Sequence, residues 1–388
     1  MDMRGDMRVG PTAVTRGEAI ELARRRVVSV VDLDALVANY RRLSEISAPA
    51  VAAPVVKGDG YGLGLIPVAT TLAKAGARLF LVARVEDGVE LRAALPGADI
   101  LVLDGLGAHD ISELEAARLM PALNDIASLV RWLARPRATP AFIHIDSGMS
   151  RLGLTLAEAP HLRELLRGAA SGAIAGYMTH FLNADEADHA RCAGQVEAFS
   201  RALSGLPRAR ISIVNSAGLF LDRERAWRGD ITRMGKALYG IHPLQPGELN
   251  PMQPVLSVYA PVLQVRDVAP GDTIGYGATF QATAAMRVAV LGIGYTNGYL
   301  RSLSGRGASV AFAGRRGPVV GRVSMDLTTV DVTDVPPADL EAGVAEVLGP
   351  SIDLSELSGL AGSNEHELQI TLGRGCHRVY VSGGGEQR

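Results

Sequence analysis

The clearest chemical signal in the sequence is a lysine that ends an apolar run and is followed by a glycine-rich loop. Val55-Val56-Lys57 leads into Gly58-Asp59-Gly60-Tyr61-Gly62-Leu63-Gly64. A lysine at the carboxyl end of a barrel strand points into the mouth of the barrel, where active sites lie. Loss of hydration there lowers the pKa of the ammonium group, and the neutral amine can form a Schiff base with a carbonyl group. The glycines allow close approach of backbone N–H groups to a phosphate, while a solvated lysine stays open as the alternative.

Lysine is otherwise scarce in this chain. Of the 39 basic residues, three are lysine (Lys57, Lys74 and Lys236), and the rest are arginine. Arginine cannot supply a neutral amine because its guanidinium group stays protonated. A mechanism that needs such an amine therefore has three candidates.

Three further segments place small residues or hydrogen-bond donors beside glycine. They are Asn215-Ser216-Ala217-Gly218, the segment 232–240 with Arg233 and Gly235, and Gly275-Tyr276-Gly277-Ala278-Thr279. The first two suit phosphate binding at strand ends, and ordinary turns are the alternative. Tyr276 lies between two glycines, where a surface turn is the default, and the spacing does not show that this tyrosine acts as a base.

The first half of the chain alternates short apolar runs with amphipathic segments. The apolar runs span residues 51–56, 79–83, 100–103, 119–123, 141–145, 175–179 and 211–214. Helix-like segments include residues 66–75, 85–94, 126–134 and 187–203. This alternation predicts parallel βα units, and the count fits an α/β fold with an N-terminal (β/α)₈ TIM barrel over residues 27–245.

From about residue 250 the pattern changes. A proline-bounded break at 251–254 precedes period-two segments at 262–268, 287–291, 319–323 and 328–332. We therefore expect a β-rich C-terminal domain over residues 246–388. Residues 1–26 form an N-terminal extension in this scheme, and Val27–Val31 is a predicted strand that pairs with the second domain.

The composition restricts the class of protein. The chain has 388 residues, 47% of them hydrophobic and 21% charged, with a formal net charge of -2. These values indicate a globular protein with a large core, and they give no reason to expect nucleic acid or a membrane as a partner. The sequence has no secretory signal pattern, and Cys192 and Cys376 have no metal-ligand or redox spacing. We expect reduced thiols, no metal site and a cytoplasmic location.

Taken together and in order, these motifs resemble the alanine racemase family over about residues 25–382. The matching segments are Val55-Val56-Lys57 with Tyr61-Gly62 and Gly64, Asp146 to Gly153, Thr179-His180-Phe181, Asn215-Ser216-Ala217, Arg233 with Leu238-Tyr239-Gly240, Gly275 to Ala278, Gly294-Tyr295 with Gly298-Tyr299, and Gly321 to Asp326. The family has an N-terminal (β/α)₈ barrel and a C-terminal β domain, in agreement with the organisation read from the sequence.

The resemblance implies interconversion of L- and D-alanine with pyridoxal 5'-phosphate (PLP). Lys57 would hold the cofactor and exchange the proton with the D-enantiomer, while Tyr276 would exchange it with the L-enantiomer. Two bases are needed because a single base returns the proton to the face from which it came. In the family the tyrosine comes from the partner subunit, so the resemblance also implies a homodimer with shared active sites.

The resemblance implies further site residues. Arg233 would face the pyridine nitrogen, and His180 would lie against the cofactor ring. The cofactor-binding residues would be Lys57, Tyr61, His180, Asn215, Ser216, Arg233 and Gly235, of which Tyr61, Ser216 and the backbone of Gly235 would hold the phosphate. The substrate-binding residues would be Arg151, Tyr276, Tyr295 and Met325.

Five positions depart from the family pattern. Leu63 replaces a common histidine, and Asn297 stands where aspartate is usual. His144 occupies the position of a lysine that some members carry as a carbamate, so Arg151 must be held another way. Arg374 falls where some members have a phosphate-binding tyrosine, and Lys236 replaces an aliphatic residue and has no assigned role.

Three other functions remain as alternatives at this point. The first is a racemase that acts on serine or another amino acid, which the pocket near Tyr295 and Met325 would decide. The second is a PLP-binding protein without catalysis, although the presence of Tyr276 and the second domain argues against it. The third is a fold III decarboxylase, although the contexts of Tyr276 and Asn215-Ser216 argue against it. Supply of D-alanine for peptidoglycan follows from the family, and a catabolic or biosynthetic-cluster role stays open.

Overall fold

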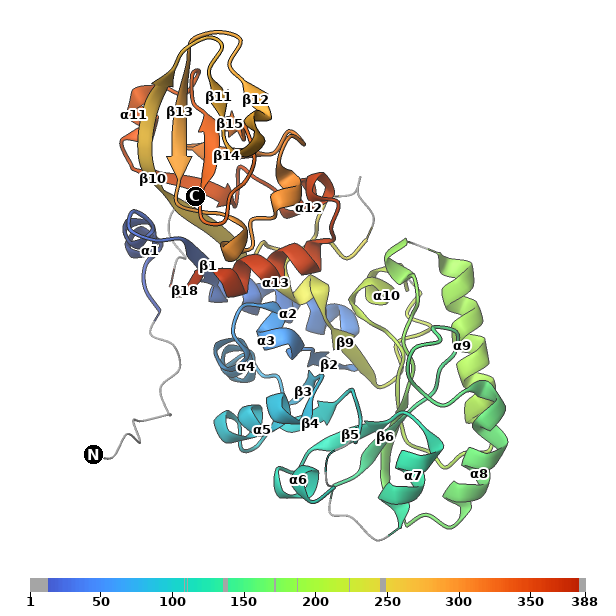
Figure 1. The fold of residues 1–388 in the computed structure, drawn as a ribbon. Helices are drawn as coiled ribbons and strands as arrows, with labels where there is room; N and C mark the ends of the chain where they lie inside the picture. Colours follow the sequence, from blue (N-terminus) through green and yellow to red (C-terminus); the bar gives the residue numbers. More distant parts are fainter. Residues whose placement is uncertain are drawn as a thin grey trace, which may run out of the picture.

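A computed structural model describes residues 13–107, 109, 111–134, 139–170, 172–186, 188–222, 224–244 and 249–383. Figure 1 shows a barrel and, against one end of it, a second body built mainly from strands of the C-terminal part of the chain. The predicted boundary between the domains falls at residues 245–246, which lie outside the described residues, as do residues 1–12 of the predicted N-terminal extension. The described part of that extension contains α1 (Arg16–Ala23).

Eight parallel strands form the barrel. They are β2 (Val51–Pro54), β3 (Leu79–Val82), β4 (Asp99–Val102), β5 (Met120–Leu123), β6 (Ala141–His144), β7 (Ile174–Met178), β8 (Arg210–Ser212) and β9 (Ile231–Met234). Strands β3 to β8 form one six-stranded sheet in chain order, and β2 pairs with β9. Parallel bridges from Val55 to Leu81 and from Asn215 to Arg233 connect the two sheets and close the barrel. The predicted barrel is confirmed, and β9 is the eighth strand, which the apolar runs did not include.

Helices surround the barrel strands (Figure 1). They are α2 (Leu33–Ser47), α4 (Leu65–Lys74), α5 (Val85–Ala94), α6 (Ile111–Ala116), α7 (Ile126–Leu133), α8 (Ala159–Arg167), α9 (His189–Leu203) and α10 (Ser216–Leu221). The predicted helices coincide with α4, α5, α7 and α9. Side-chain caps fix several of their starts: the carboxylate of Asp32 accepts a hydrogen bond from Ala35 N at the start of α2, and that of Asp125 accepts one from Ser128 N at the start of α7.

The second body contains an eight-stranded sheet. Its strands are β1 (Val28–Asp32), β10 (Leu256–Val268), β13 (Met286–Leu291), β14 (Ser309–Phe312), β15 (Arg315–Pro318), β16 (Thr328–Asp331), β17 (Val344–Leu348) and β18 (His377–Val381). The short pair β11 (Thr273–Ile274) and β12 (Phe280–Gln281) and the helices α11 (Pro337–Leu340), α12 (Leu354–Ala361) and α13 (Glu365–Gly375) complete it. As predicted, β1 joins this sheet, antiparallel to β10 and parallel to β18.

One predicted strand is wrong. Residues 319–323 form no strand, and only Val319 makes a bridge, to Val330. The chain turns at Gly321, whose φ is +71° and whose hydrogen faces the backbone of Ile274; a Cβ there would lie 2.7 Å from the Ile274 carbonyl oxygen. The alternating apolar pattern of residues 319–323 therefore does not form a strand, because the chain turns at Gly321 in a conformation that favours glycine.

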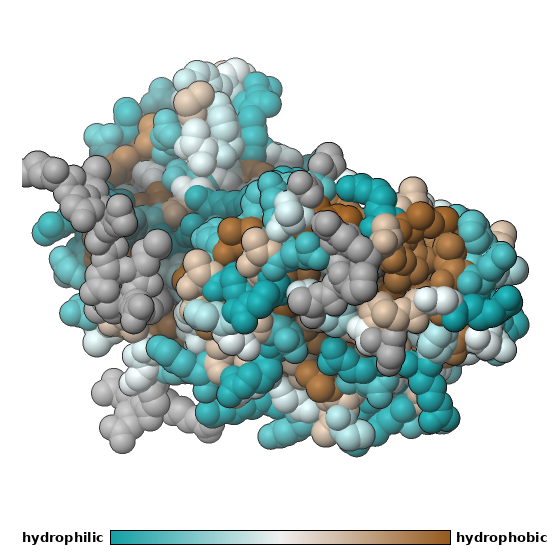
Figure 2. All heavy atoms as spheres, turned by 90° about the horizontal axis from the view of Figure 1, so that it is seen from below, coloured by the Kyte–Doolittle hydropathy of each residue, from teal (hydrophilic) through white to brown (hydrophobic). Residues whose placement is uncertain are grey.

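The surface follows the amphipathic pattern of the helices. Figure 2 views the molecule from below, with the barrel in front, and hydrophilic side chains cover most of this face while hydrophobic ones gather in a few places. The largest fully buried side chains include Trp132, Tyr177, Phe80 and Phe142, all from the barrel. Among the described helices, none has both the length and the apolar character needed to cross a membrane.

Candidate active site

A cavity of about 1030 Å³ opens where the barrel strands end. Most of its wall comes from the residues that end or follow strands: Lys57 after β2, Arg84 after β3, Asp104 after β4, His144 of β6, His180 after β7, Asn215 and Ser216 after β8, and Arg233 and Gly235 at β9. In (β/α)₈ barrels this end carries the catalytic residues, because every strand delivers a side chain to the same mouth.

Lys57 reaches this cavity from a loop with unusual backbone geometry. The three residues after it, Gly58, Asp59 and Gly60, all have φ near +60°. Two glycines therefore allow a left-handed turn directly after a strand. The ammonium group of Lys57 is accessible from the cavity, and its pKa is lowered, first by loss of hydration and then by the charge of Arg151. Lys57 therefore loses its proton at a lower pH than a fully hydrated surface lysine does.

The C-terminal part of the chain holds this loop. Arg378 Nη1 lies 2.5 Å from Asp59 Oδ2, and the hydroxyl of Tyr380 donates to the carbonyl of Leu63 at 3.0 Å. The second carboxylate oxygen of Asp59 accepts from Leu65 N at 2.8 Å. Both partners from β18 lie more than 300 residues away in sequence. The second domain therefore fixes the loop that carries Lys57.

Three hydrogen-bond donors converge on one point of the cavity wall, which we call the cradle: the hydroxyls of Tyr61 and Ser216 and the amide of Gly235. Gly235 N lies 2.8 Å from Ser216 Oγ, and a Cβ on Gly235 would lie 2.8 Å from the Tyr61 hydroxyl and 3.8 Å from Ser216 Oγ. Among the described residues, nothing hydrogen-bonds to the Tyr61 hydroxyl. The Gly235 amide donates to Ser216 Oγ, which leaves the hydroxyl protons of Tyr61 and Ser216 free for a ligand, and such donors beside a glycine suit a phosphate group.

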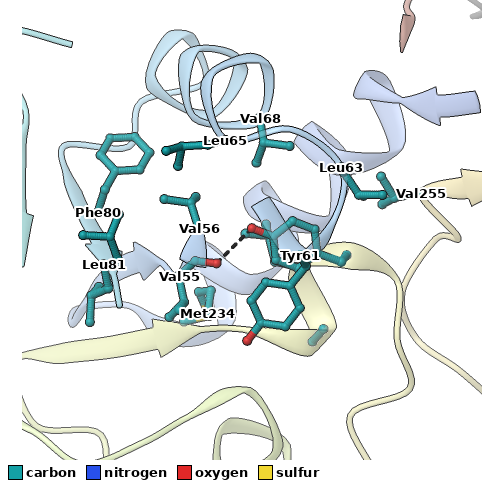
Figure 3. Packing of buried hydrophobic residues seen from close by; sticks show 14 of the residues in the cluster. Val55, Val56, Tyr61, Leu63, Leu65, Val68, Phe80, Leu81, Met234 and Val255 are labelled. Atoms are coloured by element: carbon teal, nitrogen blue, oxygen red, sulfur yellow. Dashed lines mark hydrogen bonds between the residues drawn. The ribbon is translucent and has the colours of Figure 1, made fainter. Parts of the chain in front are cut away.

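Tyr61 is held by packing rather than by hydrogen bonds. Its ring stacks on that of Tyr239 with centroids 4.4 Å apart, and the Tyr239 hydroxyl donates to the carbonyl of Val55 at 2.9 Å. Figure 3 shows Tyr61 beside Val55 and Met234. Burial raises the pKa of Tyr61 to about 12, so its hydroxyl keeps its proton and remains a donor.

Replacing Gly235 with alanine tests the cradle. The added methyl group would displace the Tyr61 hydroxyl, and we expect the dissociation constant for PLP to rise about tenfold, since inserted methyl groups in packed sites cost about 1–3 kcal/mol. Titration of the protein with PLP, followed by visible absorbance, measures this dissociation constant. Gly194→Ala in α9, where a Cβ meets nothing within 4 Å, is the control. Equal affinity in both variants would show that Tyr61 and Gly235 do not bind the cofactor together.

Arg233 is buried, and both of its Nη atoms donate hydrogen bonds to the barrel. Nη1 donates to the hydroxyl and carbonyl of Ser212, and Nη2 donates to the carbonyls of Thr179 and Ile213. Burial lowers its pKa to about 10, so the guanidinium stays charged near neutral pH. Its Nε has no acceptor among the described residues, and it is therefore the N–H available to a ligand.

The same guanidinium sets the state of His180. Arg233 Nη2 lies 3.2 Å from His180 Nδ1, and burial, followed by the charge of Arg233, holds the pKa of His180 well below its ordinary value. Because the guanidinium can only donate, Nδ1 accepts and the proton of the neutral ring lies on Nε2.

His144 and Arg151 lie in the same wall. His144 Nδ1 pairs with Asn124 Oδ1 at 2.8 Å, and burial together with the charge of Arg233 lowers its pKa to about 4. His144 is therefore neutral. Arg151 follows a turn in which the Asp146 carboxylate accepts three backbone N–H groups, and its side chain is exposed toward the cavity.

Two of the departures from the family pattern have structural roles. Leu63 is fully buried and lies near Val255 (Figure 3), so it does not line the cavity. The carboxamide of Asn297 donates to the carbonyl of Gly375 at 3.0 Å, which connects its loop to the end of α13. Asn215, predicted to bind the cofactor, lines the cavity, and its side-chain oxygen accepts from Gly218 N and caps α10.

One face of helix α13 lines the cavity, and the sequence did not predict this. His366, Ile370 and Arg374 are spaced by four residues and all line the wall, and only Arg374 was singled out from the sequence. The i, i+4, i+8 spacing was the available signal, but it does not say which helix face meets the barrel. His366 lies 5.9 Å from Tyr61, measured between ring centroids.

Three predicted site residues lie away from the cavity of their own chain. Tyr276, Tyr295 and Met325 do not line it, and their exposed fractions are 71%, 41% and 54%. All three belong to the second domain. A single described chain therefore brings together the predicted cofactor residues but not the predicted opposing base.

Comparison with known proteins shows the family of the chain. The profile of the alanine racemase N-terminal domain matches residues 31–243, and that of the alanine racemase C-terminal domain matches residues 255–380. The chain belongs to the alanine racemase family. An alanine racemase of Acidiphilium cryptum is 40% identical over 359 residues, 91% of this chain and 98% of the relative.

Two further alanine racemases extend the comparison. A catabolic alanine racemase of Mesorhizobium japonicum is 40% identical over 388 residues, 97% of this chain and 99% of the relative. The crystal structure of alanine racemase from Bartonella henselae, with covalently bound pyridoxal phosphate, is 33% identical, with a TM-score of 0.85 over 92% of this chain and 99% of that one.

Proposed function

We propose that this protein is an alanine racemase, a PLP-dependent isomerase that interconverts L-alanine and D-alanine. The observation that carries the proposal is the cavity in which Lys57, the cradle and Arg233 meet, within a chain that is about 40% identical to alanine racemases over nearly its full length. Lys57 would carry the cofactor, the cradle would hold its phosphate, and the free Nε–H of Arg233 would face the ring nitrogen. His180 and Asn215 would complete the cofactor site.

The cofactor, when bound, supplies an electron sink that makes the Cα proton of an amino acid removable. The chain's own residues then decide where the proton goes. The lowered pKa of Lys57 suits an amine that accepts and returns a proton. Arg233 remains charged, donates a hydrogen bond and has no proton to give up near neutral pH. Arg151, exposed toward the cavity, would bind the substrate carboxylate.

The second base would come from another copy of the chain. Tyr276 is exposed and lies away from its own cavity, and the same domain exposes other large hydrophobic side chains: Leu263, Val265, Tyr295, Met325 and Leu327. The barrel exposes apolar side chains as well, but the segments of Tyr295 and Met325 are hydrogen-bonded to each other, through Tyr295 N to the Ser324 carbonyl and Thr296 N to the Met325 carbonyl. Adjoining exposed apolar side chains indicate an interaction surface. We therefore propose a homodimer in which Tyr276, Tyr295 and Met325 of one copy complete the cavity of the other.

The remaining parts of the proposal concern organisation and cellular role. We divide the chain into a PLP-binding barrel at 27–245 and a β domain at 246–388, after the extension 1–26. A cytoplasmic location agrees with the two free, buried cysteines, Cys192 and Cys376. Supply of D-alanine for peptidoglycan stays a prediction, since one relative at 40% identity is a catabolic enzyme.

Incubation with PLP and L-alanine in deuterium oxide tests the function. We expect D-alanine to form with deuterium at Cα, because a two-base exchange draws the new proton from solvent. Chiral chromatography with mass spectrometry measures both. If the protein binds PLP but leaves L-alanine unchanged, the proposal is wrong. A screen with serine and other amino acids then distinguishes a different racemase from a binding protein without catalysis.

A further inference from the structure

Lys236 is a cavity residue without an assigned role. It follows the cradle residue Gly235 directly and begins the short helix η3 (Lys236–Tyr239). Its side chain lines the same cavity as the cradle, and only 12% of it is exposed. A lysine so placed has lost most of its hydration, and its position needs a partner for the charge.

The groups around Lys236 explain why a cation is needed there. Its ammonium nitrogen lies 3.5 Å from the carboxylate of Asp185, and its charge acts on Glu365 and His366 at the start of α13. Burial, followed by the charge of Lys236, lowers the pKa of His366 to about 4, so this ring is neutral. The carboxylate of Asp185 lines this wall, and it would repel a phosphate dianion placed beside it without a cation.

Lys236 shares one wall of the cavity with the cradle: it follows Gly235 in the chain, and both line the cavity together with Tyr61, Ser216 and His366. His366, on which the charge of Lys236 acts, lies 5.9 Å from Tyr61 between ring centroids, and the Tyr61 hydroxyl points at Gly235. The cradle itself contributes only neutral groups: two hydroxyls, and an amide that already donates to Ser216 Oγ. An ammonium group has three N–H donors, so a contact with Asp185 leaves two for another ligand.

We propose that Lys236 is a phosphate-binding residue that adds a formal positive charge to the neutral cradle of Tyr61, Ser216 and Gly235. Asp185 orients the ammonium group, and the phosphate dianion of PLP is its second partner. The inference rests on the proposed cofactor, and it assigns to this chain a charge-assisted contact that an aliphatic residue at this position cannot make.

The test compares PLP with pyridoxal, which has the same ring and aldehyde but no phosphate. Dissociation constants for both are measured by visible absorbance for the wild type, Lys236→Met and Lys236→Arg. Lys74→Met, which removes an exposed lysine at the end of α4, is the matched control. We expect Lys236→Met to weaken PLP about tenfold and to leave pyridoxal within about twofold. Lys236→Arg is expected to keep most of the wild-type affinity for PLP. Added salt screens the charge and reduces the difference in PLP affinity between the wild type and Lys236→Met.

Two results would overturn the inference. Unchanged PLP affinity in Lys236→Met means that the lysine makes no contact with the phosphate. Equal losses for PLP and pyridoxal mean that the side chain only shapes the cavity. Failure of the proposed function is recognised separately, since it is read from the wild type: a protein that binds PLP with the expected phosphate dependence but does not racemise alanine keeps Lys236 in its role and loses the activity.

Discussion

Lys57→Ala is expected to lose the visible absorbance of bound cofactor and to lower D-alanine formation by about 10⁴-fold, the upper end of the range for a positioned acid–base group. The loss is this large because the same amine would attach the cofactor and move the substrate proton. The side chain faces the cavity, so its removal leaves no packing void in the core. Chiral assay, absorbance and circular dichroism measure activity, attachment and folding.

The control for this variant is Lys74→Ala, which removes an exposed lysine far from the chemistry and retains wild-type rates. If Lys57→Ala keeps the cofactor absorbance, the cofactor is attached to Lys236, the other lysine that the structure describes in the cavity wall. A rate within tenfold of the wild type would contradict the role of Lys57 altogether.

Tyr276→Phe is expected to lower racemisation by about 10²- to 10⁴-fold while the cofactor stays bound. Tyr276 is 71% exposed in its own chain, so loss of its hydroxyl changes the free energy of unfolding by less than about 0.5 kcal/mol. Lys57 still serves one face of the substrate. The variant therefore exchanges the Cα proton of D-alanine with deuterium but makes little L-alanine, and mass spectrometry distinguishes these outcomes.

Mixing the two variants tests whether Tyr276 acts across a dimer. In a two-fold symmetric dimer, a Lys57→Ala copy and a Tyr276→Phe copy together form one intact site and one doubly altered site. Random pairing of equal amounts during co-expression gives about a quarter of wild-type activity per chain. Activity that stays at the level of the separate variants would mean that Tyr276 does not complete the site of another copy.

The main parts of the fold were readable from local patterns. Buried strands of three to five residues between amphipathic helices are specified by neighbours in sequence, so the barrel and helices such as α5 were predicted closely. Strand β9 was missed because Ile231–Met234 includes Thr232 and Arg233, two polar residues that a barrel strand buries. Its burial depends on pairing with β2, some 180 residues earlier.

The sequence by itself determined which residues we propose for the chemistry, since Lys57, Ser216 and Arg233 stand where strands end, and strand ends of a barrel meet. Only the tertiary structure decided what surrounds them. The ion pairs of Asp59 with Arg378 and of Lys236 with Asp185 join segments that are far apart in the chain. Spacing along a chain specifies local conformation, whereas long-range contacts depend on how whole elements pack, and no local pattern records that packing.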